Sequence, residues 1–206
     1  MQQVTQERFA PIVANGGFMV FDDLLPGDSF RALCEEGLRH RGLATECQRL
    51  EHDVSGFRTG NPARWFATAA GGEVQRGIYH DGGLVRKIAT LCRRRVRPTG
   101  GQGTYSYYDR PGHFLGLHRD INTCDVTMIT CLHRAYSAEE SGALQIYYKS
   151  AARKLSDILE EGHPSIDIHL EPEQSVLLLG GFLPHEVMPA AEGYARSISV
   201  LCFEMT

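Results

Sequence analysis

The sequence predicts a mainly β fold, a double-stranded β-helix or jelly roll, with supporting helices in its N-terminal part. From Thr104 onward, short runs of β-branched and apolar residues alternate with turn residues, a pattern typical of jelly rolls. Helical spacing of apolar residues is concentrated before that point. A chain of 206 residues is long enough for one well-buried core. We therefore expect a single domain over 1–206, with an N-terminal helical buttress over 1–100 and a jelly-roll core over 104–204.

The first expected elements are a strand over Gly17–Phe21 and a helix that begins at Asp28 or Ser29, because either side chain can cap a helix N-terminus. Apolar residues at helical spacing give this helix a packing face: Phe30, Leu33, Cys34 and Leu38. The segment 41–82, which carries the single tryptophan Trp65, has no pattern that assigns its structure.

A second amphipathic helix is expected around residues 84–92, where apolar residues again recur at helical spacing. A basic run over Arg93–Arg97 follows it. Cations near a helix C-terminus are favoured by the helix dipole, so a solvated helix end is one interpretation of this run. A patch for an anionic substrate is the other.

Eight short strands are expected in the C-terminal half: 104–108, 114–118, 125–132, 143–148, 165–170, 174–180, 185–188 and 195–203. A stretch with helical spacing over 151–162 interrupts them and ends at a glycine. Its apolar stripe consists of Ala152, Leu155 and Leu159. This helix is either a lid over the mouth of the barrel or a plain surface helix.

Charge and composition exclude several classes of protein. A formal net charge of -4 gives no general attraction to nucleic acid or anionic membranes, and no apolar run approaches the length of a membrane span. The polar start Met1–Arg8 lacks a secretory signal, so we expect a cytoplasmic protein. The six cysteines show no paired spacing and are interpreted as buried free thiols.

The motif that says most about chemistry is His118-Arg119-Asp120, followed by His185. On a strand, His118 and Asp120 share one face, because side chains alternate with a period of two. His185 follows another β-branched and apolar run and so comes at a strand end. Two neutral imidazoles and one carboxylate are typical of a site that holds a divalent iron on one side and leaves the opposite positions open.

Arg196 opens the last expected strand, and the connection from His185 contains Pro189 and Gly193, which can return the chain antiparallel beside itself. His185 and Arg196 would then project from adjacent strands into the same interior. A buried guanidinium in that place is suited to a carboxylate, which it meets through two charge-assisted hydrogen bonds.

Taken together, these residues resemble the Fe(II)/2-oxoglutarate-dependent dioxygenases, in particular the prolyl-hydroxylase-like branch, over about residues 104–204. The motifs that carry the resemblance are Tyr108, His118-Arg119-Asp120, Val126–Ile129, Ser141–Leu144, the run Pro172–Leu179 before Pro184–Val187, and Arg196. The first hundred residues match only in general form.

The resemblance implies that His118, Asp120 and His185 bind Fe(II), that 2-oxoglutarate chelates the iron, and that dioxygen takes the vacant position. Arg196 would bind the distal carboxylate of 2-oxoglutarate. Turnover would release succinate and carbon dioxide and oxidise a substrate C–H bond. Hydroxylation is the expected outcome because Asp120 stands where related halogenases carry a small residue.

Further roles are open at the sequence level. Tyr108 either donates to the co-substrate or is a core tyrosine. Thr127 either faces 2-oxoglutarate or is structural. Cys131 stands where the resembling branch has a tyrosine that also holds the distal carboxylate, so Tyr105 or Ser199 is the candidate helper.

Two more histidines, His113 and His133, lie near the expected ligands in sequence and are interpreted as surface or rim residues.

We rank a small-molecule substrate, such as an amino acid or a biosynthetic intermediate, above a peptide or protein substrate of the prolyl-hydroxylase type, because a short lid closes more readily over a small molecule. A non-catalytic, cupin-like metal- or ligand-binding protein is a further alternative, which Arg196 disfavours. Nucleic-acid demethylation is disfavoured by the negative charge. The sequence gives no indication of the oligomeric state.

Overall fold

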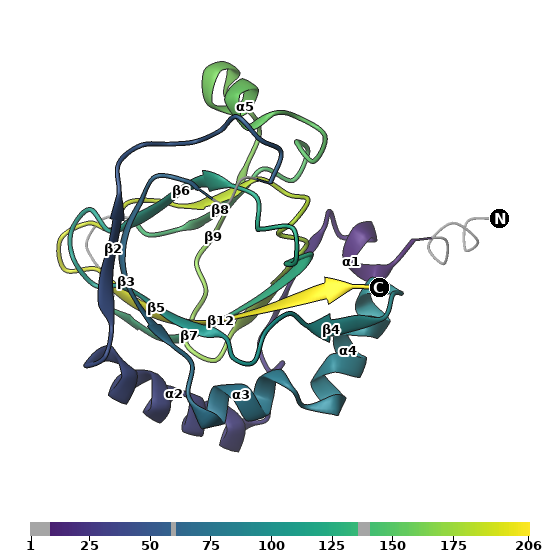
Figure 1. The fold of residues 1–206 in the computed structure, drawn as a ribbon, viewed down its shortest axis with the longest axis vertical. Helices are drawn as coiled ribbons and strands as arrows, with labels where there is room; N and C mark the ends of the chain where they lie inside the picture. Colours follow the sequence, from purple (N-terminus) through teal and green to yellow (C-terminus); the bar gives the residue numbers. More distant parts are fainter. Residues whose placement is uncertain (1–8, 59–60, 136–140) are drawn as a thin grey trace.

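The computed structural model describes residues 9–58, 61–135 and 141–206, so the expected polar start Met1–Arg8 lies outside the described residues. An antiparallel sheet curls into a barrel (Figure 1), with the strand order β1-β10-β7-β12-β5-β3-β6-β11-β8-β9. In addition, β2 pairs with β3 and β4 pairs with β12. The expectation of a mainly β jelly roll with N-terminal helices is confirmed.

The strands expected in the C-terminal half are all present; those over 104–108 and 114–118 have the expected bounds, and the others have shifted ends. Their bounds are β5 Thr104–Tyr108, β6 Phe114–His118, β7 Val126–Ala135, β8 Leu144–Ile146, β9 Ile166–Ile168, β10 Ser175–Leu178, β11 His185–Val187 and β12 Ala195–Met205. The N-terminal part supplies β1 Phe18–Phe21, β2 Thr45–Arg49, β3 Arg64–Ala70 and β4 Val96–Pro98. The unassigned segment 41–82 therefore contributes two strands to the barrel.

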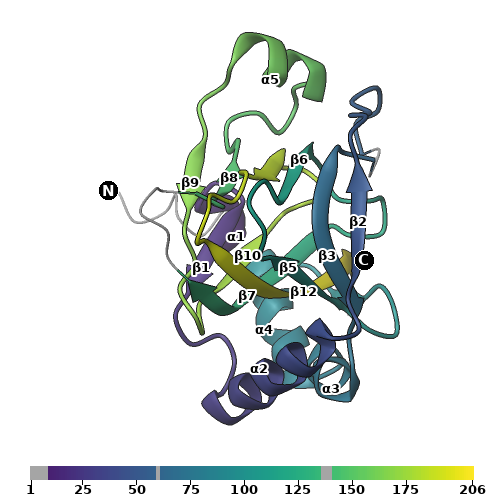
Figure 2. The same ribbon diagram turned by 90° about the vertical axis from the view of Figure 1, so that its left-hand side faces the viewer.

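Helices α2 Gly27–Arg41, α3 Glu73–Tyr79 and α4 Gly82–Cys92 cover the outer face of the sheet, as Figure 2 shows. The short helix α1 Pro11–Ala14 contacts α4 and β1. Alternate residues of β7 serve the two faces: Met128 packs in the cluster beneath the helices, whereas Ile129 and Cys131 belong to the cluster inside the barrel. The helices thus cover one side of the sheet and leave its other side to line the interior.

The first expected helix begins one residue before Asp28, close to the expected start, but the expected cap was wrong. No side chain caps α2; its N-cap is Pro26, and Asp28 lies in the first turn. The fixed φ of proline suits the entry to a helix, so α2 begins before the expected cap.

The expected packing face of α2 was wrong at Leu38, which is 78% exposed. The helix instead turns Leu33, Glu36 and Gly37 toward the sheet. Glu36 is buried because it accepts hydrogen bonds from the backbone of α3 and from the Tyr105 hydroxyl. Because Glu36 is polar, the spacing of apolar residues alone does not predict this packing face.

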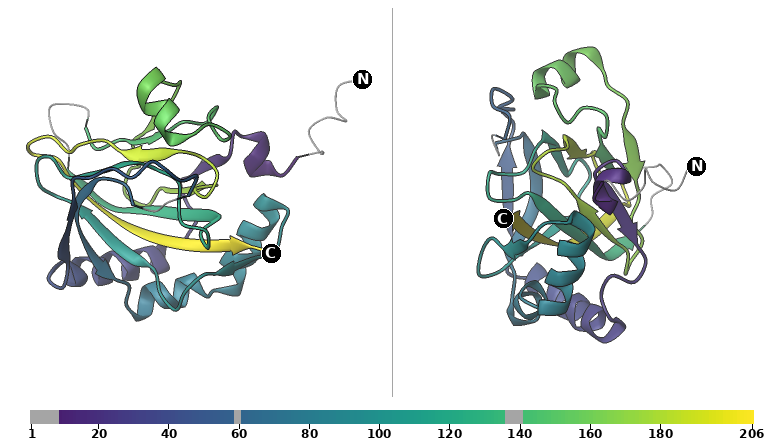
Figure 3. Two further views of the ribbon diagram at one scale, coloured as in Figure 1. Left: turned by 45° about the horizontal axis from the view of Figure 1, so that its top comes forward. Right: turned by 90° about the vertical axis from the view of Figure 1, so that its right-hand side faces the viewer.

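The helix expected over 151–162 is shorter, α5 Leu155–Glu161, and it is not a lid. Its buried residues are Leu155 and Ile158, which pack on Leu117 of β6. Leu159, a member of the expected stripe, is half exposed. Leu117 alternates with His118 and faces the outside of the barrel, so α5 covers the outer side of β6 (Figure 3).

The cysteines were only partly as expected. Cys124 and Cys202 form a disulfide, so these two are not free thiols. The other four, Cys34, Cys47, Cys92 and Cys131, are free, and of these Cys92 and Cys131 are buried. The pairing joins residues far apart in sequence, which a search for closely spaced cysteines does not detect. Within the described ranges, no helix has the length and apolar character needed to cross a bilayer.

Candidate metal centre

The structure brings His118, Asp120 and His185 together at one end of the barrel. His118 is the last residue of β6, His185 is the first of β11, and the two are paired in register. Their Nε2 atoms lie 3.7 and 3.8 Å from Asp120 Oδ1. The three possible ligand atoms all lie within 4.8 Å of one another. This cluster of donors is compact enough to surround a single ion.

A β-bulge aims His118 into the interior. His185 of β11 pairs with His118 of β6, and Val187 pairs with Leu115. One residue lies between the two partners on β11, but two residues lie between the two partners on β6. The extra residue in β6 lets Leu115 and His118 both face the interior, since a bulge shifts the alternation of a strand by one. Leu115 and His118 accordingly line the same cavity.

Backbone carbonyls hold both imidazoles. The Nδ1 atom of His118 lies 2.8 Å from the Gly116 carbonyl oxygen, and that of His185 lies 2.9 Å from the Leu183 carbonyl oxygen. Each Nδ1 therefore carries the proton and donates it, which leaves the Nε2 lone pair free for a metal ion.

The protonation states also suit metal ligands. Burial raises the pKa of Asp120, but the nearby His185 and His118 and the Thr127 hydroxyl outweigh this effect and bring the pKa to about 2. Burial, followed by the proximity of His118, lowers the pKa of His185 to about 4. At neutral pH Asp120 is a carboxylate and His185 is a neutral imidazole, the forms in which these groups bind metals.

Asp120 is held by Thr127 of β7 and by Gly180 in the segment that follows β10. The Thr127 hydroxyl donates a hydrogen bond to Asp120 Oδ2, and the Asp120 backbone N–H donates to the Gly180 carbonyl at 2.9 Å. A Cβ atom at position 180 would collide with the Asp120 carboxylate, so glycine is required there. The predicted contact of Thr127 with 2-oxoglutarate stays a prediction; the contact that the structure shows is with Asp120.

Arg119, between two of the clustered residues, points to the opposite side and is fully buried. Its guanidinium donates to five backbone carbonyls, those of Phe57, Ser150, Ala151, Arg153 and Phe182. It also lies 4.0 Å from the centroid of the Phe57 ring. Arg119 thereby ties together the turn before His185, the loop that leads into α5 and the segment around Phe57. Sequence analysis assigned it no role.

Arg196 is buried inside the barrel, and no described residue forms an ion pair with it. Only 3% of the residue is exposed, and its guanidinium carbon lies 5.2 Å from the centroid of the Tyr108 ring. Within the described part of the chain the guanidinium forms no ion pair or hydrogen bond, and its Nε is buried without an acceptor. Arg134, opposite Arg196 in register, has Glu171 at 2.9 Å. Arg196 is thus a buried cation that lacks an anion.

Neither predicted helper of Arg196 is in place. The Tyr105 hydroxyl donates to Glu36, and Ser199 accepts from Gln75, both on the outer face beneath the helices. Tyr194 is a buried residue near Arg196, which partly offsets the rise of the Tyr194 pKa caused by burial, and its hydroxyl donates to the Gly142 carbonyl at 3.3 Å. Tyr194 and Arg196 are two positions apart, so on an extended chain their side chains lie on the same face.

The other two histidines differ in outcome. His113 is fully buried, against expectation, and packs edge-on to Trp65 with ring centroids 5.0 Å apart. The indole N–H of Trp65 donates to Glu46, which is exposed, so this pair lies on the outer side of β3, away from the triad. His133 is exposed, as expected.

A cavity of about 260 Å³ lies directly beside the triad. Its lining is formed by residues of β2, β3 and β6, the loop after β6 and the disulfide: Cys47, Pro62, Arg64, Phe66, Leu115, His118, Arg119, Asp120, Ile121, Cys124 and Cys202. None of its lining residues comes from α5. This cavity is the space in which a small molecule would meet the triad.

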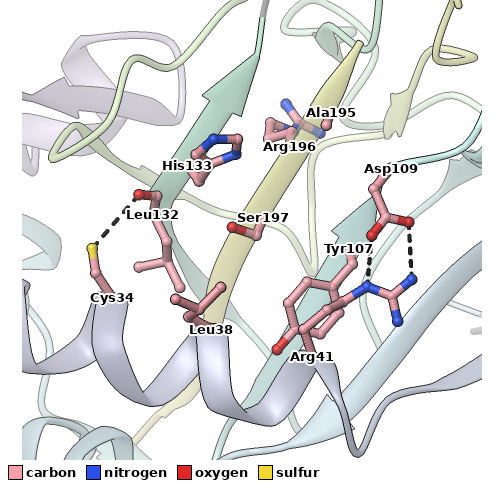
Figure 4. A pocket seen from close by; sticks show the side chains of 10 residues that line it. All are labelled: Cys34, Leu38, Arg41, Tyr107, Asp109, Leu132, His133, Ala195, Arg196 and Ser197. Atoms are coloured by element: carbon pink, nitrogen blue, oxygen red, sulfur yellow. Dashed lines mark hydrogen bonds and ion pairs between the residues drawn. The ribbon is translucent and has the colours of Figure 1, made fainter. Parts of the chain in front are cut away.

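A second hollow lies on the outside of the sheet, where Leu38 of α2 faces the ends of β7 and β12 (Figure 4). The ion pair between Arg41 and Asp109, with an N···O distance of 2.6 Å, forms one wall. Arg196 is among the lining residues of this groove, but no residue of the triad is.

Comparisons with known proteins place this fold among oxygenases. No family model matches the sequence, and no curated protein is significantly similar to it. Among solved structures, a prolyl-4-hydroxylase from Pseudomonas putida aligns over 95% of this chain and 96% of that chain, with a TM-score of 0.64 and 18% identity. The fold is shared with this hydroxylase.

Two further structures have the same architecture. The epimerase SnoN, in complex with Fe³⁺, α-ketoglutarate and nogalamycin RO, has a TM-score of 0.70 at 11% identity, over 96% of this chain and 82% of that chain. EctD from S. alaskensis, with bound Fe, has a TM-score of 0.61 at 15% identity, over 91% and 72%. At these identities the similarity shows the fold alone.

Proposed function

We propose that this protein is a non-haem iron oxygenase that uses 2-oxoglutarate as its co-substrate and hydroxylates a C–H bond. The observation that carries the proposal is Arg196, a buried cation that has no ion-pair partner among the described residues and lies in the interior of the barrel whose end bears the triad. A buried unpaired charge is costly, and a co-substrate carboxylate would offset that cost. The fold shared with oxygenases supports the same conclusion.

The donor set fits iron. His118, Asp120 and His185 would hold Fe(II) through two imidazole nitrogens and one carboxylate oxygen, a combination that is typical of oxygenases with open positions. When bound, the iron supplies the activation of dioxygen that is coupled to oxidative decarboxylation of 2-oxoglutarate. The described residues contain no other cluster of three or more possible ligands.

The protein's own residues bind and orient the co-substrate. The guanidinium of Arg196 would donate two parallel hydrogen bonds to the distal carboxylate of 2-oxoglutarate. The Tyr108 ring lies against this guanidinium, and its hydroxyl would donate to the same co-substrate. Thr127 holds the carboxylate of Asp120 in place.

The interior of the barrel excludes water from this chemistry. Apolar side chains of several strands fill it, among them Ile129, Ile146, Val176, Leu178 and Ile198, all buried. A dry interior strengthens the electrostatic attraction between Arg196 and a carboxylate.

The cavity size supports a small-molecule substrate, such as an amino acid or a biosynthetic intermediate. Its volume of about 260 Å³ is at or below the lower end of ordinary ligand pockets. The lid argument no longer applies, because α5 lies outside the barrel. A peptide substrate is the second candidate, since a peptide-bound prolyl hydroxylase from Trichoplax adhaerens has the same fold, with a TM-score of 0.63 and 18% identity.

The decisive experiment combines anaerobic absorption spectroscopy with succinate release. Wild-type protein with Fe(II) should develop a visible charge-transfer band when 2-oxoglutarate is added. Arg196→Gln should weaken 2-oxoglutarate binding about a hundredfold or more, and Arg196→Lys should recover part of it, because a point charge lacks the planar fork.

The exposed Arg86→Gln of α4 removes one charge far from the barrel interior and serves as the matched control, with unchanged binding. Unchanged affinity in Arg196→Gln would refute the assignment and favour a cupin-like protein without oxygenase activity.

A further inference from the structure

A second arginine lines the cavity beside the metal centre and has no role in the proposed binding of Fe(II) or 2-oxoglutarate. Arg64 opens β3 and lines the cavity beside His118 and Asp120. Its neighbour at the same alternation, Phe66, lines the same cavity, which places both side chains on the inner face of the strand.

Arg64 has no partner among the described residues. It forms no ion pair and no side-chain hydrogen bond there, and its Nε atom is buried without an acceptor. The other arginine of this cavity, Arg119, is fully engaged with backbone carbonyls. Arg58, which reaches the loop after β6, is paired with Asp125 at 2.9 Å. Arg64 is therefore the unused cation of the cavity.

The strand pairing makes this position unfavourable without an anion. Arg49 of β2 lies directly opposite Arg64 in register. Like charges opposite one another destabilise a sheet. Arg49 donates to the Glu51 carbonyl at 3.0 Å and lies 3.7 Å from the Glu51 carboxylate, whereas Arg64 has no such compensation.

We propose that Arg64 binds a carboxylate of the substrate and thereby selects small molecules that carry a free carboxyl group. This inference rests on the proposed oxygenase function and names the substrate class of the same site. The planar fork of Arg64 would hold the carboxylate, while the rest of the molecule lies against Phe66 and Leu115 and extends toward the triad.

Two separate cations then serve two separate carboxylates. Arg196 lies on β12 and contacts Tyr108 of β5, whereas Arg64 lies on β3, beyond β5 in the sheet. A carboxylate fits Arg64 better than a phosphate does, because the lining of this cavity offers no second free cation for a dianion. Apart from Arg64 it consists of apolar residues, His118, Asp120, the cysteines and Arg119, whose guanidinium is occupied.

The test measures melting temperature on protein loaded with Fe(II) and 2-oxoglutarate without oxygen. The probes are the twenty protein amino acids, the corresponding carboxamides, the matching carboxylic acids without the amino group, and inorganic phosphate. The compounds that raise the melting temperature should carry a free carboxylate, and their carboxamides should not. Arg64→Gln should weaken binding of these acids about ten- to hundredfold, and Arg64→Lys should recover part of it.

Two controls separate this role from others. Without probes, Arg64→Gln should melt no lower than the wild type, because it removes the like charge opposite Arg49. Its 2-oxoglutarate affinity, measured by the charge-transfer band, should stay within about twofold of the wild type. Arg86→Gln should behave as the wild type in every assay.

Each other outcome overturns the inference. These outcomes are equal binding of carboxamides, tighter Arg64-dependent binding of phosphate, unchanged acid binding in Arg64→Gln, loss of 2-oxoglutarate binding in that variant, or no stabilisation of the wild type by any acid. Failure of the proposed function has a separate sign: the wild-type protein with Fe(II) forms no charge-transfer band with 2-oxoglutarate. This result does not depend on whether the carboxylic acid probes raise the melting temperature.

Discussion

At the scale of the residue, the polar groups around the metal centre fall into two kinds. One kind has all its partners within the chain, such as Arg119 with its carbonyls and Asp120 with Thr127. The other kind consists of Arg196 and Arg64, each of which has a buried Nε atom without an acceptor among the described residues. Buried polar groups in native proteins are normally satisfied, which is why we propose Arg196 and Arg64 as the positions that bind carboxylates.

Arg119 should be a positioning residue for the triad. Burial lowers its pKa to about 10, so it stays charged at neutral pH. Arg119→Met would leave several buried carbonyls without donors and should lower the free energy of unfolding by about 3 kcal/mol or more. It should also weaken Fe(II) binding, because the turn before His185 loses its anchor. Urea denaturation and metal titration check this, with Arg86→Met as control. Wild-type iron affinity in Arg119→Met would contradict the positioning role.

The buried His185 should make the metal-free protein sensitive to mild acid. Its pKa in the folded state is about 4, below the ordinary value of about 6.5. Between these values the unfolded chain takes up a proton that the folded chain does not, so stability falls as the pH drops from about 6.5 to about 4. The loss should be on the order of 3 kcal/mol. Denaturation at several pH values measures it, and His185→Gln should show a flatter profile.

At the scale of the element, the strands do more than frame the site. The bulge in β6 turns His118 inward, and the pairing of β6 with β11 sets the two histidines opposite each other. The adjoining β8 and β9 extend the same side of the barrel. Two ligands on neighbouring rigid strands need little reorganisation to bind a metal ion.

The helix α5 should stabilise the fold without closing the site. Leu155 is buried against Leu117, whereas Leu159 of the same helix is half exposed. Leu155→Ala should lower the free energy of unfolding by about 2–4 kcal/mol, and Leu159→Ala by less than about 0.5 kcal/mol. Both variants should release succinate from 2-oxoglutarate at the wild-type rate. A change in that rate confined to Leu155→Ala would show that α5 reaches the site after all.

At the scale of the whole molecule, the disulfide between Cys124 and Cys202 joins two distant parts of the chain next to the metal centre. Cys124 follows the loop that carries Asp120, and Cys202 lies on β12. The disulfide lines the cavity beside the triad. Disulfides are rare in cytosolic proteins, so the cytoplasmic location stays a prediction from the sequence.

Removal of this disulfide should destabilise the protein. The two cysteines are separated by 78 residues, and a bond that closes a loop of this length stabilises by about 2–4 kcal/mol in ordinary cases. The double variant Cys124→Ala with Cys202→Ala should lose about this much, whereas Cys92→Ala should respond to oxidation state no differently from the wild type. Denaturation with and without a reductant measures both. Six titratable thiols in the unfolded, unreduced wild type would show that the disulfide is absent.

The sequence alone determined the parts of this protein that depend on local pattern and residue chemistry. Alternating apolar runs predicted the strands from Thr104 onward, and helical spacing predicted α2 and α4. The donor types and spacing of His118, Asp120 and His185 predicted the cluster that the structure brings together. Each of these signals lies within a few neighbouring residues, or in the chemistry of a few side chains, and needs no knowledge of what packs across the sheet.

Only the tertiary structure decided the partners that come from distant strands. The carbonyls that surround Arg119, the pairing of Cys124 with Cys202 and the outward position of α5 all depend on register and on the bulge in β6. The same holds for Arg64, whose lack of a partner is visible only when β2, β3 and β6 are paired. Contacts between segments far apart in the chain are set by how the strands align, and a shift of one residue would turn each of these side chains to the other face.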